Sequence, residues 1–287
     1  MAELRSDGCV WVSPADSPAK QAYRAAKEAS PLIEWLARIG FAAKGVVYGL
    51  VGTFTILSTI GLYRDTKGSA GVLRSIADAS YGPVVLAALG IGLAGYALWC
   101  LVKAIFDAEG DGWVYRVASA FEGLFYLSLV AAVVCLMTGF RASVTDDQGA
   151  EGWTAWLLAW PGGKWAAVGT GLLVSGYGCY ALFGACRPGL DCRLNLSDLT
   201  PRAARWLARI SRFGMASWGV VFLLLGLFLI AAGWHSNPAE AKSVPDALNA
   251  IKSRPYGPAL TGTIGVGMIC YSVYDFALAR YRHIKPV

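Results

Sequence analysis

Two ionisable residues, Lys44 and Glu122, lie inside long apolar stretches of this sequence, where charged side chains are costly and commonly mark functional sites. Both hold the same position of a repeated motif, and Trp218 holds it in a third copy. If the copies pack around a common centre, the ammonium and the carboxylate face one another. Such a pair could move protons or ions. It could also be purely structural, or reach the membrane surface, since each charge lies six residues past an arginine.

Tyrosines recur deeper in the same stretches and form the second group of candidate residues. A buried tyrosine hydroxyl requires a hydrogen-bond partner. We therefore expect these side chains either to bond between helices or to line a cavity, and both packing and a pocket for a lipid or other apolar ligand remain open. The tyrosines concerned are Tyr48, Tyr126, Tyr96, Tyr177 and Tyr271.

The histidines, cysteines and acidic residues of the sequence argue against an enzyme, a metal site and a cofactor. The two histidines, His235 and His283, lie at opposite ends of predicted helices and cannot share a ligand. Cys186 and Cys192 have no second Cys or His pair with which to hold zinc. Glu122 shows no carboxylate partner, because Asp275 is expected near the inner end of its helix.

The elements that position these residues are three copies of a two-helix unit, which begin at Arg38, Arg116 and Arg212. A period this long is typical of supersecondary repeats. The second helix of each copy carries two aromatic residues three positions apart. The predicted segments are an N-terminal segment (1–34), repeat 1 (35–110), repeat 2 (111–190), a basic amphipathic linker (191–210), and repeat 3 with a short tail (211–287).

Composition places these helices in a membrane. The chain is 56% hydrophobic and 15% charged, whereas soluble domains contain about 25% charged residues. Apolar runs of 21 to 24 residues match the ~20 residues of a membrane-spanning helix. The sequence therefore predicts an all-α, polytopic membrane protein of six transmembrane helices, arranged as three pseudo-threefold-related hairpins. The runs lie at 40–61, 83–106, 118–140, 165–185, 213–234 and 258–278.

Positive charge predicts the orientation. Of 25 Lys and Arg residues, 17 fall on the side shared by both termini and 8 on the other. Cytoplasmic flanks carry the excess of Lys and Arg, so both termini are expected in the cytoplasm. The first 30 residues have no apolar core typical of a cleaved signal peptide.

The outer loops of repeats 1 and 3 each contain a short amphipathic stretch before Tyr81-Gly82-Pro83 or Tyr256-Gly257-Pro258. Such stretches commonly lie among lipid headgroups. The middle repeat lacks the Tyr-Gly-Pro sequence. It carries four tryptophans instead, which favour the membrane interface. They are Trp153, Trp156, Trp160 and Trp165.

The linker before the fifth helix carries a stripe of arginines, Arg202, Arg205, Arg209 and Arg212, with Trp206 on another face of the same helix. A basic amphipathic helix beside a membrane span is expected to bind anionic lipid on the cytoplasmic side. An acidic partner subunit is the alternative, and nucleic acid is not needed to explain the pattern. Glycine-rich helix faces would pack within the chain or against a second copy.

The motif Arg-x-Gly-x-x-x-Lys-Gly-Val-Val-Tyr, complete from Arg38 to Tyr48, recurs in order along the chain. It resembles a bacterial membrane family known only as a domain of unknown function, whose members carry three tandem two-helix repeats. The resemblance spans nearly the whole chain and implies the bacterial inner membrane, but no activity. Ala118, Glu122 and Trp218 depart from the motif and break the equivalence of the copies.

Function is therefore predicted only in outline. The leading hypothesis is a non-enzymatic accessory or scaffold subunit of a membrane complex, without a cofactor. The alternative is transport of an ion or small solute, or binding of a lipid or apolar ligand, along the pseudo-threefold axis.

Overall fold

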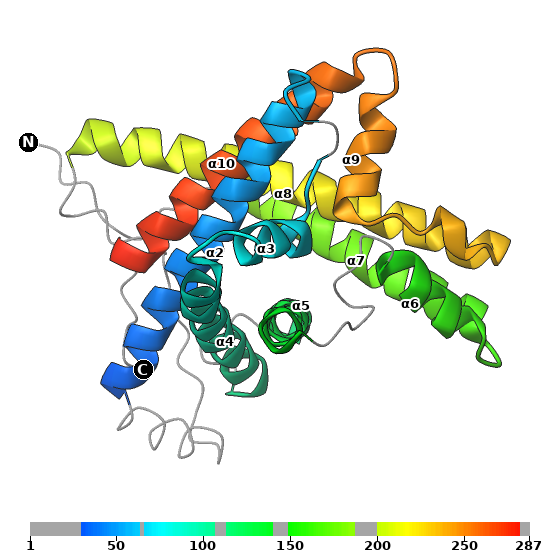
Figure 1. Ribbon diagram of the computed structural model, residues 1–287, viewed down its shortest axis with the longest axis horizontal. Coiled ribbons are helices and arrows are strands. Elements are labelled where there is room, and N and C mark those ends of the chain that lie inside the picture. The colour runs from blue at the N-terminus through cyan, green and yellow to red at the C-terminus, as the bar shows by residue number, and fades with distance from the viewer. Residues whose placement is uncertain (1–29, 64–65, 107–112, 140–148, 187–199, 282–287) are drawn as a thin grey trace, which may run out of the picture.

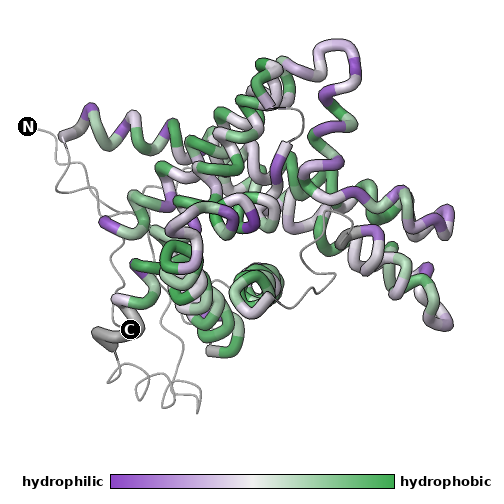
Figure 2. The backbone as a smooth tube through the Cα atoms, viewed as in Figure 1, coloured by the Kyte–Doolittle hydropathy of each residue, from purple (hydrophilic) through white to green (hydrophobic). Residues whose placement is uncertain are grey.

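The computed structural model describes residues 30–63, 66–106, 113–139, 149–186 and 200–281, which are helical and contain no strand. Six of their helices are long and apolar enough to cross a membrane, which confirms the predicted all-α, polytopic fold class. Hydrophobic residues run along the length of these helices (Figure 2). The six are α2 (Ser30–Thr59), α4 (Gly82–Phe106), α5 (Trp113–Thr138), α7 (Gly163–Cys186), α8 (Pro201–His235) and α10 (Gly257–Tyr281). Residues 1–29 of the N-terminal segment, 191–199 of the linker and 282–287 of the tail lie outside the described residues, and so do Cys192 and His283.

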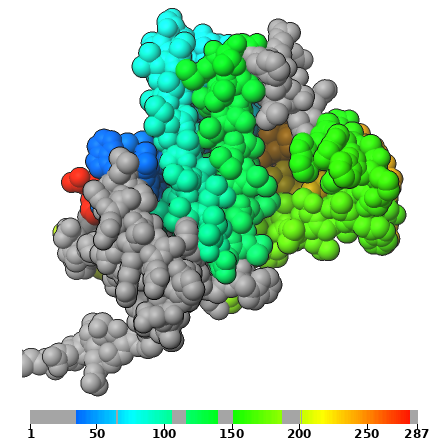
Figure 3. All heavy atoms as spheres, turned by 90° about the horizontal axis from the view of Figure 1, so that it is seen from below, coloured from blue at the N-terminus to red at the C-terminus, as the bar shows by residue number. Residues whose placement is uncertain are grey.

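The most extensive helix contacts join one repeat to the next. Helix α4 packs on α5, α7 packs on α8, and α10 returns to pack on α2, so the last repeat closes onto the first. The three pairs point in different directions (Figure 1), and α4 and α5 stand side by side in Figure 3. Within repeats, α2 contacts α4 and α8 contacts α10, whereas α5 and α7 approach each other less closely. Pseudo-threefold symmetry itself stays a prediction.

Glycines allow the paired backbones to touch. A Cβ on Gly52 would lie 2.7 Å from the carbonyl oxygen of Gly265 across the α2–α10 contact. A Cβ on Gly178 would lie 2.6 Å from the backbone nitrogen of Leu223 across the α7–α8 contact. Small residues permit such close approach, and the dispersion contacts that follow stabilise helix pairs in lipid.

A short helix precedes the second membrane helix of every repeat. These helices are α3 (Ser69–Ala77), α6 (Gly149–Leu158) and α9 (Val244–Lys252). The apolar faces of α3 and α9 do not point into lipid headgroups as expected, because Leu73 and Leu248 are fully buried in the protein core. Helix α3 packs on α2, α4 and α5, and α9 packs on α10 and α8, so each joins two helix pairs, whereas α6 lies along α7 (Figure 1).

The middle repeat makes the same turn from its short helix into its second membrane helix, despite its different sequence. Gly82, Gly163 and Gly257 each begin a membrane helix, and a Cβ on any of them would collide with a carbonyl oxygen of the preceding short helix. Helix α6 is thus the counterpart of α3 and α9. It differs in its surface, since Trp153, Trp156, Trp160 and Trp165 are all more than half exposed.

The predicted boundary between linker and third repeat, at residues 210 and 211, falls inside one helix. Helix α8 is continuous over 35 residues, or about 50 Å at 1.5 Å per residue. Thr200 caps its first turn by accepting a hydrogen bond from the Ala203 N–H. No proline or glycine interrupts residues 202–213, so the arginine stripe continues directly into the membrane span.

At the other end of α8, the 3-10 turn η3 (Pro238–Glu240) folds back on the helix. His235 Nδ1 lies 2.7 Å from Glu240 Oε2, and this hydrogen bond lowers the pKa of the Glu240 carboxyl below its ordinary value. The pair helps to hold the turn against the helix end.

Candidate functional site

Lys44 lies at the meeting point of four membrane helices. Its side chain is 3% exposed, and its ammonium donates to Glu122 Oε1 on α5 at 3.1 Å. It also donates to the hydroxyls of Tyr96 on α4 at 3.2 Å and Tyr271 on α10 at 3.0 Å. Because an ammonium has three N–H donors, these contacts use all of them. The repeat position shared by Lys44 and Glu122 therefore brings the two charges into direct contact.

Aromatic rings surround the same ammonium. The Lys44 Nζ lies 4.7 Å from the ring centroid of Tyr96, 5.0 Å from that of Tyr271 and 5.5 Å from that of Tyr126. Cations placed over aromatic faces in a desolvated site gain about 2 kcal/mol or more. The rings and the carboxylate together compensate for the burial of a positive charge within the membrane.

A second carboxylate, Asp275 on α10, also lies close to Lys44. Its Oδ1 is 3.6 Å from the Lys44 Nζ, and its side chain is fully buried. Neither carboxylate oxygen has a hydrogen-bond partner among the described residues. The expectation that Glu122 lacks a second membrane carboxylate nearby was therefore wrong, because α10 brings Asp275 to the same ammonium.

Glu122 is held in place from two sides. The Tyr96 hydroxyl donates to its Oε1 at 2.6 Å, in addition to the bond from Lys44. Lys103 on α4 is 4% exposed and adds further positive charge near this carboxylate. The side chain of Glu122 keeps 17% exposure, whereas Lys44 and Asp275 are almost completely enclosed.

A cavity of about 110 Å³ adjoins these charges and receives side chains from all six membrane helices. Many of its walls come from equivalent positions of the three repeats: Lys44, Glu122 and Trp218; Tyr96, Tyr177 and Tyr271; Phe41, Ser119 and Met215. These residues lie in the first half of α2, α5 and α8 and in the second half of α4, α7 and α10. That end of the helices is the one predicted to face the cytoplasm.

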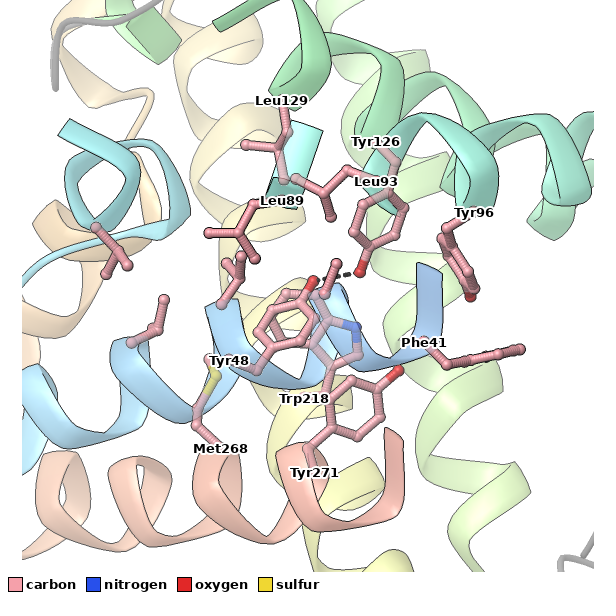
Figure 4. Packing of buried hydrophobic residues seen from close by; sticks show 14 of the residues in the cluster. Phe41, Tyr48, Leu89, Leu93, Tyr96, Tyr126, Leu129, Trp218, Met268 and Tyr271 are labelled. Carbon is pink, nitrogen blue, oxygen red and sulfur yellow. Dashed lines mark hydrogen bonds between the residues drawn. The ribbon is translucent and has the colours of Figure 1, made fainter. Parts of the chain in front are cut away.

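The cavity ends at a layer of aromatic and aliphatic side chains. The hydroxyls of Tyr48 and Tyr126 share a hydrogen bond of 2.7 Å at this level (Figure 4). A hollow of only about 10 Å³ extends beyond Glu122 among phenylalanine and tyrosine rings, which is space for at most one water molecule. Farther out the core is apolar: Leu89 and Leu93 lie together, and Met268 is buried on the other side of Tyr48 (Figure 4). None of these side chains lines the larger cavity.

The other predicted site residues lie on the cavity walls or away from the cavity. Trp218 stacks on Tyr271 with ring centroids 5.7 Å apart and forms one wall of the cavity. Tyr177 lines both hollows. The arginine stripe lies in the first turns of α8, where Arg202, Arg205, Arg209 and Trp206 are exposed and Arg212 is half-buried.

The equivalent arginines at the repeat starts have a visible structural role. Arg38 donates to the carbonyl oxygens of Ala279 and Arg280 at the end of α10. Arg116 donates in the same way to Ala104 and Ile105 at the end of α4. Positive side chains at helix C-termini satisfy free carbonyls and favour the helix dipole, so these residues fasten neighbouring repeats together.

Comparisons with known proteins agree with the repeat organisation. Residues 39–107, 117–187 and 213–282 each match the family described as Domain of Unknown Function (DUF1206), which confirms the predicted three-repeat resemblance. A protein of Bacillus subtilis (strain 168), "Uncharacterized protein YxxB", is 27% identical over 266 residues, which cover 90% of this chain and 94% of the relative. No solved structure matches the chain.

Proposed function

The chain belongs to the DUF1206 family, and we propose that this membrane protein binds a small polar solute in its central cavity as one step of transport. The observation that carries the proposal is a charged cavity walled by equivalent positions of three repeats. Structural ion pairs alone need no adjoining space, whereas a solute site does. The protein acts without catalysing a covalent reaction.

The chemistry of the walls indicates the class of solute. Glu122 presents a partly exposed carboxylate, with Tyr177 and Trp218 beside it, and a carboxylate among aromatic rings suits an amino or ammonium group. Lys103 offers a positive charge on the same cavity. A solute with an amino group and an anionic group, such as a small amino acid, matches both charges.

The orientation belongs to the same proposal. The cavity lies toward the helix ends that carry the excess of Lys and Arg, so it opens to the cytoplasm of a bacterial inner membrane with both termini inside. The closed aromatic layer then faces outward. Transport requires a second conformation in which this layer parts, as in alternating access.

The test is uptake and efflux of radiolabelled small amino acids and alkylamines in proteoliposomes containing the full chain. We expect Glu122→Gln to abolish flux of at least one compound, while the matched change Glu240→Gln leaves flux intact. Folding of both variants is checked by gel filtration and helix content. Equal flux in wild type and Glu122→Gln would refute the cavity as the route.

A scaffold function, which was the leading hypothesis from the sequence, becomes the second candidate beside the charged cavity, and exposed surfaces favour it. The arginine stripe with Trp206 on α8 forms an exposed basic and aromatic surface, suited to anionic lipid or to an acidic partner subunit. Purification in mild detergent tests it. A partner that co-purifies with wild type and is lost from an Arg205→Gln, Arg209→Gln variant supports the scaffold role, and a chain that always purifies alone argues against it.

A further inference from the structure

Asp275 is the buried group for which the solute site gives no role. Its side chain extends from α10 and is fully buried, and neither of its carboxylate oxygens accepts a hydrogen bond among the described residues. Buried polar groups are nearly always bonded, and a carboxylate without such bonds calls for a separate explanation. Its neighbours on the same helix face, Tyr271 and Leu278, line the cavity. Asp275 therefore lies directly behind the cavity wall.

Lys44 cannot satisfy both carboxylates at once. Its three N–H groups already point to Glu122, Tyr96 and Tyr271 at 3.0 to 3.2 Å, and Asp275 is farther away at 3.6 Å. One ammonium thus forms ion pairs with two acids, of which only the nearer lies within hydrogen-bond distance. An ionised acid without hydrogen bonds is strongly disfavoured in a low-dielectric interior.

Few charged groups act on Asp275. The charged groups of the described chain that act on it are Lys44 from α2 and Glu122 from α5. Tyr48 from α2 and Tyr271 from its own helix are near enough to interact electrostatically with it. Helix α8 also packs on α10 but adds no charged group to this set. Lys44 is therefore the one cation in this set of neighbours.

We propose that Asp275 is a proton-carrying residue coupled to occupation of the cavity at Glu122. While Lys44 bonds to Glu122, Asp275 is a neutral carboxylic acid. When the amino group of a solute takes the place of Lys44 at Glu122, the Lys44 ammonium turns to Asp275. The carboxylic O–H bond then breaks, its proton passes to cavity water, and the carboxylate pairs with the ammonium. Lys44 keeps all its protons, so one cation enters for each proton released.

This inference rests on the proposed function for its trigger, but its central claim can be tested without any solute. The full chain, labelled with ¹³C-carboxyl aspartate, is reconstituted in vesicles and studied by infrared spectroscopy from about pH 4 to about pH 9. We expect a carboxylic C=O band from one buried aspartic acid at neutral pH in wild type. Asp275→Asn removes this band, while the control Asp246→Asn, in the short helix α9, retains it.

Glu122→Gln provides the decisive second variant, because it changes the partner of Lys44 and leaves Asp275 in place. The Lys44 ammonium then turns to Asp275, and the aspartic-acid band at neutral pH disappears as the carboxylate forms. A band that survives in Asp275→Asn, a wild type without the band, or a band unchanged in Glu122→Gln would each overturn the proposal. Failure of solute flux with these infrared results intact would instead refute only the proposed function.

Discussion

The ion pair of Lys44 and Glu122 allows a quantitative test of how the site is stabilised. Lys44→Met removes the ammonium but keeps an unbranched apolar side chain among the three tyrosine rings. Glu122 then stays largely enclosed, and the Tyr96 hydroxyl is the hydrogen-bond donor that remains to it among the contacts described above. Breaking a buried pair from one side costs about 3–5 kcal/mol, and contacts of the Met sulfur with the rings recover about 0.3–1.5 kcal/mol. We expect a net loss of about 3 kcal/mol in unfolding free energy.

Glu122→Gln is expected to cost less than Lys44→Met. The ammonium keeps its two tyrosine hydroxyls, and Asp275 at 3.6 Å can replace the lost charge. The double variant removes both charges together and leaves neither without a partner. Its loss is expected to be about 1 kcal/mol, since a buried pair replaced as a whole is often neutral. The cycle then gives a coupling energy of about 2 kcal/mol or more.

The assay is unfolding of the purified chain in mild detergent, followed by tryptophan fluorescence. A loss of about 3 kcal/mol corresponds to a fall of roughly 6–12 °C in Tm for a chain of this size. The control is Lys164→Met, which removes a half-buried ammonium 5.1 Å from the ring centroid of Trp234. If Lys44→Met is no more destabilising than Lys164→Met, or if the two site variants are additive, the argument from buried charge is refuted.

Three further predictions concern other parts of the molecule. Gly178→Ala places a methyl group against the backbone of Leu223 and should destabilise the chain by about 1–3 kcal/mol. The control Gly176→Ala, whose methyl group meets nothing within 4 Å, should leave Tm unchanged or raise it. Equal effects of the two changes would contradict the close packing of α7 on α8. Tyr48→Phe leaves the Tyr126 hydroxyl without its 2.7 Å partner and should cost about 1–3 kcal/mol, and adding Tyr126→Phe should cost little more, as measured by denaturant unfolding. Glu240→Gln should reduce stability near neutral pH, because the folded pKa of Glu240 lies below its ordinary value of 4.5. The stabilisation by the ionised Glu240 exists above the unfolded pKa and disappears as pH falls through the folded pKa. The unfolding curves of wild type and variant should therefore converge in acid, and a difference that stays constant with pH would argue against this role of Glu240.

The sequence contained enough information to predict the membrane spans and the part of the site formed by Lys44, Glu122 and the tyrosines. Lys44 and Glu122 could be paired because equal positions in tandem repeats occupy comparable places once the repeats pack together. The tyrosines followed from the same register. These inferences need only the repeat period and the apolar run lengths, which do not depend on how the helices cross.

Asp275 was missed because its depth was judged from its distance to the helix end. The better signal was its spacing, four residues after Tyr271, which places both on one face of α10. The equivalent positions in the other repeats hold Cys100 and Ala181, both buried, so the position itself faces inward in all three. The partner of α2 could not be predicted either, because like surfaces within one chain can pair in several ways.

The closure of α10 onto α2 has a consequence for biosynthesis. The ribosome delivers the first repeat to the bilayer long before its largest contact surface has been translated, and Lys44 enters the lipid ahead of its ion-pair partner. Glu122 arrives with the second repeat, and Asp275 only with the third. The nascent protein must therefore shelter an uncompensated cation, by a shallow position of the first helix or with the help of the insertion machinery, until the second repeat emerges.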